Sequence, residues 1–305
     1  MGFLDDYEDV QERDIADEIG FLKEPTKNIL GFIRDNAPLK PWQADIVSML
    51  YEEAIYFFPQ RQTKVMNEGW ASTTDSVIMA EKGFISLGQK SDDCGIIEYA
   101  DHKMGVLGGK YSMNPYKLGF YLFADIRERW DKGRFGQEYE ECTDMHKKEN
   151  WNIPTNLGKE KIFEVRKFYD DLTFIHEFFT EEFCRKQEYF HWKHYPNGDY
   201  RIDTRDYKTI KKNLMQRHVN GGLPDIRLME PNYLGRGIML LEHFHDGRPL
   251  YESYLEDVLS SIRFLWNNDV VLVTKDESNK ERVFWKKANY FDVMDRGELN
   301  KHIGV

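Results

Sequence analysis

The apolar residues of the first 185 positions recur mostly at intervals of three and four, the spacing of amphipathic helices. Proline begins two of these segments, one from Pro25-Thr26 through Asp35 and a stronger one from Pro41-Trp42. Along the second segment one apolar stripe is expected to face the core: Ile46, Val47, Met49, Leu50, Ala54 and Phe57. Helical spacing then continues in segments as far as residue 187, so this part of the chain is predicted to be a helical array.

The pattern changes at about residue 186, where two aromatic-rich runs flank Asn197-Gly198, a strong hairpin signal. Short apolar runs typical of strands follow, with two helical patterns among them, at residues 225–230, 237–245, 270–274 and 282–286. Strands gathered at one end of a chain favour an α+β fold over a doubly wound sheet. We therefore predict a helical array in the first ~185 residues, followed by a mixed or antiparallel sheet module with two helices.

Three parts are expected along the chain: a leader at residues 1–24, a helical domain at 25–185 and an α+β module at 186–305. The leader is strongly acidic and poor in aromatic side chains, which is typical of a solvated helix or a disordered segment. It lacks the basic and apolar regions of a signal peptide, and no apolar run of the sequence is long enough to span a bilayer.

The net charge of −11 argues against nucleic acid or an anionic membrane surface as a partner, because both attract basic proteins. Proteins or small molecules are the expected partners instead. The three cysteines, Cys94, Cys142 and Cys184, are far apart and odd in number, which is the usage of a reducing compartment. These features predict a cytoplasmic protein.

The segment Asn67-Glu68-Gly69-Trp70 places a carboxylate, an amide and an indole beside a glycine within a predicted helix. A glycine there costs roughly 1 kcal/mol relative to alanine, so something is expected to press against the backbone. Carboxylates cluster near it, and because buried carboxylates are costly unless paired or metal-bound, they are candidate site residues: Glu52, Glu53, Glu68 and Asp75. The alternative is a packing motif in which Glu68 pairs with Lys64 and Trp70 fills the core.

Histidines supply weaker candidates. His243 and His245 lie two apart on a predicted strand and hence on one face, but a third metal ligand is not evident nearby, and a hydrated sheet face is the alternative. His176-Glu177 suggests a metalloprotease helix, yet position 180, where the second histidine is required, is threonine.

The run "PWQADIVSMLYEEAIYFFPQRQTKVMNEGWAS" resembles the SpoVR family, the stage V sporulation protein R proteins. The resemblance continues through "NPYKLGFYLFADIRERW", "DDLTFIHEFFTEEFC" and "LPDIRLMEPNYLGRGIMLLEHFHDGRPL", and covers about residues 25 to 275. By the family pattern, Glu68 is expected near Glu52 or Glu53 and near Asn114-Pro115-Tyr116. Further candidate site residues are His102, Asn114 and Tyr116.

The resemblance also implies roles. Family members are typically longer at the amino side, where they carry a His-x-x-x-His-x-x-Phe-Phe element that this chain lacks. In gluzincin metallopeptidases a helical Asn-Glu element supplies the third zinc ligand after two histidines. By that analogy Glu68 would be one ligand of an incomplete site, with Asn67 and Asp75 orienting it. No cofactor is expected in this chain alone, and zinc only in a complete assembly.

Two functional classes follow from the resemblance, so whether the chain is an enzyme stays open. In one, it is a regulatory or scaffold component of a system for sporulation, spore cortex formation or kinase-linked stress, with a PrkA-type serine kinase and a von Willebrand A-type protein as partners. In the other, it is half or a remnant of a zinc-dependent hydrolase whose histidines lie in a separate amino-terminal SpoVR part. The chain also departs from the family pattern: after the Asn-Glu-Gly-Trp-Ala-Ser segment many members continue with Tyr-Trp-His, whereas this chain has Thr73-Thr74-Asp75.

Overall fold

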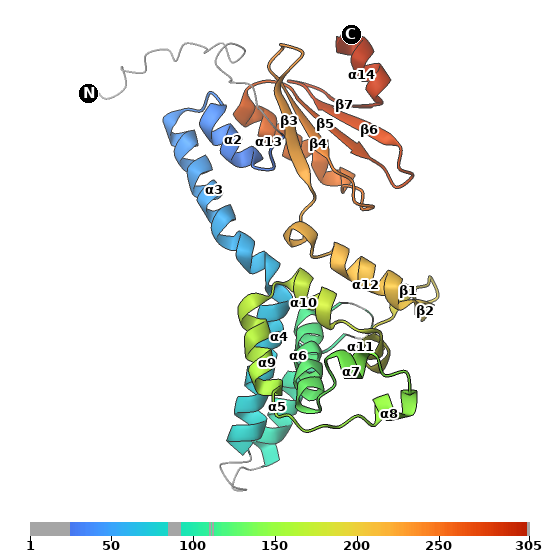
Figure 1. The fold of residues 1–305 in the computed structure, drawn as a ribbon. Coiled ribbons are helices and arrows are strands. Elements are labelled where there is room, and N and C mark those ends of the chain that lie inside the picture. The colour runs from blue at the N-terminus through green and yellow to red at the C-terminus, as the bar shows by residue number, and fades with distance from the viewer. Residues whose placement is uncertain (1–24, 85–92, 110, 112, 304–305) are drawn as a thin grey trace, which may run out of the picture. The chain divides into compact units, whose positions relative to one another are not determined.

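The computed structural model describes residues 25–84, 93–109, 111 and 113–303, so the acidic leader predicted at residues 1–24 lies outside the described part. Contacts between residues divide the described chain into two units (Figure 1). The sheet unit consists of residues 25–57 and 223–303, and the helical unit of residues within 58–222. Helices precede a five-stranded mixed sheet along the chain, which confirms the predicted α+β class.

The sheet unit is built around five strands in the order in which they follow in the chain: β3 (Ile226–Tyr233), β4 (Ile238–His243), β5 (Val270–Lys275), β6 (Glu281–Lys286) and β7 (Phe291–Met294). Neighbouring strands are antiparallel except β4 and β5, which are parallel. The parallel pair needs a crossover, and α13 (Leu255–Trp266) supplies it after the short 3-10 turn η3 (Glu252–Tyr254). Four strands were predicted, whereas β7 is a run of four residues that the apolar pattern did not reveal.

Helices supply apolar side chains to both faces of this sheet. On one face, α2 (Ile29–Asn36) and α13 pack against β3, β4, β5 and β6, and the Trp266 indole donates a hydrogen bond to the Gly237 carbonyl at 2.8 Å. On the other face, Leu299 of α14 (Arg296–Ile303) packs against Val271, Val283 and Trp285. Burial on both faces explains why β5 reads as a continuous apolar run rather than an alternating one.

Two expectations for the amino-terminal helices were wrong. The first helix starts at Ile29 rather than at Pro25-Thr26, because Thr26 forms an antiparallel bridge with Leu228 and the Asn28 side chain caps the helix at Gly31 N. The second helix, α3 (Pro41–Gln62), starts at the predicted proline, but its apolar stripe does not face a core. Val47 is its only buried residue, whereas Met49 is 62% and Leu50 50% exposed. Periodicity identifies an apolar face and does not specify what covers it.

The helical unit contains most of the remaining elements. Its helices before residue 170 are α4 (Lys64–Ser76), the π-helical segment η1 (Val77–Phe84), α5 (Asp93–Val106), α6 (Pro115–Asp131), α7 (Gln137–Glu140), α8 (Met145–Glu149) and α9 (Gly158–Phe168). Those after it are α10 (Asp171–Phe178), α11 (Glu181–Lys186), α12 (Tyr207–Gln216) and the 3-10 turn η2 (Val219–Gly222). The helical pattern predicted over 159–187 is thus three helices, because the side chains of Asp170 and Thr180 start α10 and α11 as N-caps. Its core contains Phe123, Phe174 and Phe178.

The hairpin predicted at Asn197-Gly198 is present as β1 (His191–His194) paired with β2 (Tyr200–Thr204). Gly198 has φ +87° and donates to the Tyr195 carbonyl, which closes a turn that needs a residue free of a Cβ clash. The hairpin and α12 belong to the helical unit, while α2 and most of α3 belong to the sheet unit. The boundaries between the units therefore lie at 57/58 and 222/223, whereas one boundary was expected at 185/186. The sheet unit takes helices from both ends of the chain.

Candidate functional site

The mid-helix glycine of Asn67-Glu68-Gly69-Trp70 lies at a close crossing of α4 and α6. A Cβ built on Gly119 of α6 would lie 2.6 Å from Gly69 Cα, and one built on Gly69 would lie 2.9 Å from Phe120 N. Both distances are shorter than real Cβ contacts, so neither position has room for a side chain. The element pressed against this backbone is α6 itself, which begins at Pro115 of the Asn-Pro-Tyr motif.

Trp70, the next residue, contributes to packing. Its ring meets Phe123 and Phe163 edge to face at 5.4 and 5.0 Å, and the Arg166 guanidinium lies over it at 4.8 Å. Such aromatic pairs contribute about 0.5–1.5 kcal/mol beyond their buried area. This matches the part of the packing alternative in which Trp70 fills the core.

Glu68 is half-buried, and its Oε2 atom is fully buried without a hydrogen-bond partner. Burial raises the pKa of Glu68 above its ordinary value, and the charge of Lys64 one turn earlier opposes that rise only in part. Among the described residues, Glu68 and Lys64 do not form an ion pair. The Glu68 carboxylate therefore lies in a poorly solvated position, and Lys64 on the same helix offsets only part of the cost of burying its charge.

The other acidic and amide candidates lie on α3 and α4. Asn67 is exposed and its side-chain amide donates to Thr63 Oγ1 at 3.0 Å, while Asp75 forms an ion pair with Lys103 of α5 at 3.2 Å. Glu52 and Glu53 are exposed on the part of α3 that belongs to the sheet unit. Asn67 and Asp75 thus have local partners, and the roles of all four residues at a site stay predictions.

Three further candidates, His102, Asn114 and Tyr116, lie on α5 and at the start of α6. The Asn114 side chain caps α6 at Lys117 N (3.2 Å) and donates to the carbonyls of Val106 and Gly108, both at 2.9 Å. Asn114 thus joins the end of α5 to the start of α6, a structural use of an amide with both donors and acceptor engaged. Tyr116 is 39% exposed and His102 is exposed on α5.

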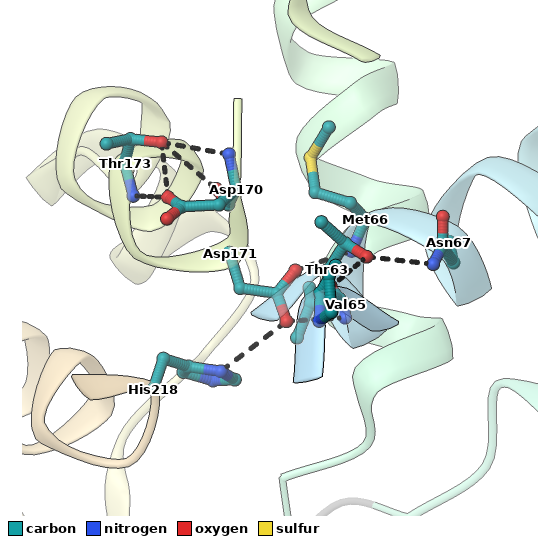
Figure 2. Close-up of polar contacts among 9 residues, drawn as sticks. Thr63, Val65, Met66, Asn67, Asp170, Asp171, Thr173 and His218 are labelled. Atoms are coloured by element: carbon teal, nitrogen blue, oxygen red, sulfur yellow. Dashed lines mark hydrogen bonds and ion pairs between the residues drawn. The ribbon is translucent and has the colours of Figure 1, made fainter. Parts of the chain in front are cut away.

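A buried polar group that the sequence did not single out lies at the start of α4. The stretch from Phe58 to Ser72 is two helices rather than one, since α3 ends at Gln62 and α4 starts at Lys64. Asp171 of α10 is 1% exposed, and its two carboxylate oxygens accept the backbone N–H groups of Val65 and Met66 at 2.9 and 2.8 Å (Figure 2). Asp171 thereby caps the N-terminus of α4, 106 residues away in the chain. The N-terminus of a helix favours a negative charge.

His218 lies on the other side of this carboxylate, with Nδ1 3.6 Å from Asp171 Oδ2 (Figure 2). Its Nε2 atom is buried without a partner, and burial lowers the pKa of His218. Burial also raises the pKa of Asp171 to about 6, although the bonds from Val65 and Met66 oppose the rise. No local sequence motif marks Asp171 or His218, because their contact joins segments that are distant in the chain.

His243 and His245 of the sheet unit are adjacent but differ from the expected strand pair. His243 is the last residue of β4 and 5% exposed, whereas His245 lies beyond the strand. Their ring centroids are 5.7 Å apart, and His243 Nδ1 lies 2.8 Å from Thr274 Oγ1 of β5. Burial, and then the charge of His245, lowers the pKa of His243.

The donor set does not fit a complete zinc site. Within residues 25–84, 93–109, 111 and 113–303, no three His, Cys, Asp or Glu side chains come together in a way that could hold a metal ion. Zinc sites in proteins need three or four such ligands. Glu68 is one such ligand, and the described residues do not complete such a set around it. The same described helices include none whose length and apolar content would let it cross a membrane.

Comparisons with known proteins match residues 4–277 to one family. The family model described as SpoVR like protein matches residues 4–223, and the model described as SpoVR-like C-terminal domain matches residues 224–277. The boundary between the two models falls one residue after the change from the helical to the sheet unit. No solved structure matches the chain.

The chain is also similar to the uncharacterized protein YcgB of Escherichia coli (strain K12), with 25% identity over 284 residues. That match covers 88% of this chain and 53% of YcgB, so the chain spans about half the length of this relative. The family models together cover most of the sequence, including all the motifs quoted above. The chain belongs to the SpoVR family.

Proposed function

We propose that the chain is a protein-binding component, regulatory or scaffold in role, of a larger assembly. The observation that carries this proposal is the apolar face of α3. Six large side chains share that face at helical spacing and are all exposed: Trp42, Ile46, Met49, Leu50, Tyr56 and Phe57, called here the α3 stripe. Contiguous exposed apolar surface of this kind is a feature of interaction sites.

The composition of the α3 stripe supports a protein partner. Trp, Tyr, Phe and Met are enriched in the buried centres of protein interfaces, and a regular helix presents them in a fixed geometry. By family resemblance we propose a PrkA-type serine kinase or a von Willebrand A-type protein as the partner, in sporulation and cortex formation or in a kinase-linked stress system. Both would meet the chain in the cytoplasm.

The test is direct binding of the purified chain to each purified partner, followed by analytical ultracentrifugation. Met49→Glu and Tyr56→Glu place a charge on side chains that are 62% and 68% exposed, so the fold should tolerate them. We expect each to weaken binding at least tenfold. Phe168→Glu, on a side chain 71% exposed in the helical unit, is the matched control and should bind normally.

Two results would contradict the proposal. Neither partner would bind the wild-type chain at concentrations of about 100 μM, which corresponds to a negligible affinity for a specific complex. Alternatively, both would bind the stripe variants and the control variant equally, which would place the interface elsewhere on the chain.

A second function is favoured by one specific observation, the fully buried Glu68 Oε2 without a partner. In this alternative the chain is one half or a remnant of a zinc-dependent, gluzincin-like hydrolase, and Glu68 awaits histidines from a separate amino-terminal SpoVR part. Metal analysis of the purified chain, alone and mixed with such a part, tests it. Stoichiometric zinc only in the mixture, lost on Glu68→Ala but retained on Glu53→Ala, would support the alternative; no zinc in either sample would remove it.

A further inference from the structure

One stretch of the helical unit is basic although the chain as a whole is acidic. It consists of the hairpin β1–β2 and helix α12, residues 191–217, and is called here the basic segment. It contains seven lysines and arginines and three aspartates, so it carries a net charge of +4 while the remainder of the chain carries −15. The overall charge of −11 therefore conceals a local surface that attracts anions.

The three aspartates of the basic segment are engaged by neighbouring groups. Asp199 forms an ion pair with Arg201 at 3.1 Å, and Asp203 Oδ2 lies 3.0 Å from His191 Nδ1. Asp206 is the N-cap of α12. Five exposed cations remain, and none of them has an ion pair among the residues that the structure describes: Lys193, Arg205, Lys208, Lys212 and Arg217.

The placement of these cations is unfavourable within the chain itself. Lys208 and Lys212 lie four residues apart on α12 and hence on one face, and two like charges at that spacing destabilise a helix. Lys193 lies directly opposite Arg201 across the hairpin, where like charges are also destabilising, and only Arg201 has an ion-pair partner. An anionic partner would relieve the repulsion in both places, so the basic segment favours the binding of an anion.

The hairpin separates its cations from its exposed aromatic rings. His194 and Tyr200 are cross-strand neighbours with ring centroids 4.7 Å apart, and the adjacent cross-strand pair is Lys193 and Arg201. Because successive residues of a strand point to opposite faces, the rings and the cations lie on different faces of the hairpin. Single-stranded nucleic acids bind where cations and stacking rings share a surface, so this arrangement disfavours them.

We propose that the basic segment binds a short acidic polypeptide segment of a protein partner in an extended conformation. Alternate residues of an extended chain lie about 6–7 Å apart on one side. That spacing is close to the separation of about 5–6 Å between residues i and i+4 of a helix, so successive carboxylates can meet Lys208 and Lys212. Arg205 and Lys193 supply further groups that bind carboxylates. The proposal does not depend on the α3 stripe or on Glu68, because those residues lie outside residues 191–217.

The test measures the binding of a fluorescein-labelled peptide of six Asp-Glu repeats to the full chain by fluorescence anisotropy. We expect a dissociation constant of about 100 μM or tighter at about 50 mM salt. Binding should be at least tenfold weaker at about 500 mM salt, where the screening length falls to about 4 Å. An uncharged peptide of six Asn-Gln repeats should not bind. A single DNA strand of about 12 nucleotides should bind at least fivefold more weakly than the acidic peptide, because its bases cannot stack beside the cations.

Variants then locate the contact. Lys208→Gln combined with Lys212→Gln should weaken the acidic peptide about tenfold, and Lys193→Gln should weaken it about threefold. Lys208→Gln or Lys212→Gln alone should also raise the melting temperature of the free chain at low salt, because one like charge is removed. Lys159→Gln combined with Lys167→Gln is the matched control, since both lysines are exposed on α9 of the same unit, and should bind the peptide normally.

Three results would overturn the proposal. They are the failure of the acidic peptide to bind at about 1 mM, equal affinity for the DNA strand, which would mean that the basic segment binds any polyanion, and an equal loss of affinity in the α9 control. A lower melting temperature of Lys208→Gln or Lys212→Gln would also count against it, since the lysine would then have an anionic partner within the chain. Met49→Glu of the α3 stripe should leave peptide binding unchanged, so this test and that of the proposed function fail separately.

Discussion

Gly69 of α4 and Gly119 of α6 face each other at a helix crossing so close that a Cβ on Gly119 would lie 2.6 Å from Gly69 Cα. The carbonyl of Val65 and the backbone nitrogen of Phe120 also lie at this crossing. The neighbours are backbone atoms, which cannot rotate away as a flexible side chain would. Both glycines are therefore required by packing, and each belongs to a segment that carries the family resemblance.

Gly69→Ala and Gly119→Ala should each destabilise the chain by about 3 kcal/mol, because overpacking at a rigid backbone contact forces the two helices apart. The free energy of unfolding from urea titration measures this loss. Gly105→Ala is the control: it lies in α5 with no atom within 4 Å of a built Cβ, so it should stabilise by about 0.5–1 kcal/mol through helix propensity. Equal effects at all three positions would contradict the close crossing.

Glu68→Gln should stabilise the isolated chain. The substitution keeps the shape of the side chain and removes a charge that burial disfavours, as the raised pKa of Glu68 indicates. The urea midpoint at neutral pH should rise without a change in slope. Glu53→Gln, on an exposed residue of α3, is the control and should leave the midpoint unchanged. A clear loss of stability in Glu68→Gln would show that Glu68 forms a stabilising pair, as in the packing alternative.

Asp171 should make stability depend on pH in a direction opposite to that of most carboxyl groups. Burial raises its folded pKa to about 6, above its ordinary value of 3.8, so the folded state holds the proton more tightly than the unfolded state. Its contribution is fully present below about pH 4 and is lost as the pH rises to about 6, by roughly 3 kcal/mol in total.

Asp171→Asn removes this contribution, so the difference in unfolding free energy between wild type and variant should change by that amount across the same interval. At pH 7 the variant should be the less stable protein, because an amide offers one acceptor where Val65 and Met66 N–H require two. Asp170→Asn, which keeps an N-cap acceptor for Thr173, is the control. Parallel stability curves for wild type and Asp171→Asn between pH 4 and 6 would contradict the raised pKa.

Thr274→Val should destabilise the sheet unit by about 1–3 kcal/mol, because it leaves the buried His243 Nδ1 atom without its partner. The same substitution in a His243→Phe background should cost little, since both polar partners are then absent. Thermal unfolding of the four proteins provides this double-mutant cycle. An equal cost in both backgrounds would mean that Thr274 acts through packing instead of through the hydrogen bond.

Local signals in the sequence were sufficient for many elements. Pro41 starts α3 because its ring presets the helical φ and its missing N–H is not needed in a first turn. Asn197-Gly198 marks the turn of the hairpin, and the continuous apolar run of β5 is typical of a strand buried on both faces. These features depend on neighbours within a few residues, so the sequence predicts them directly. The family motifs likewise identified the family without a structure.

Long-range contacts decided the rest. The bridge from Thr26 to Leu228 moved the start of α2, and Asp171 supplied the cap that divides α4 from α3. Gly69 in a predicted helix indicated that something lies close to the backbone, but only the tertiary structure identified Gly119 as the neighbour. Likewise the sequence shows an apolar face on α3, but Ile46, Met49 and Leu50, which were expected to face the core, are exposed. Helical periodicity records which side of a segment avoids water, whereas burial depends on which distant segment reaches that side, and the chain's own local pattern does not contain that choice.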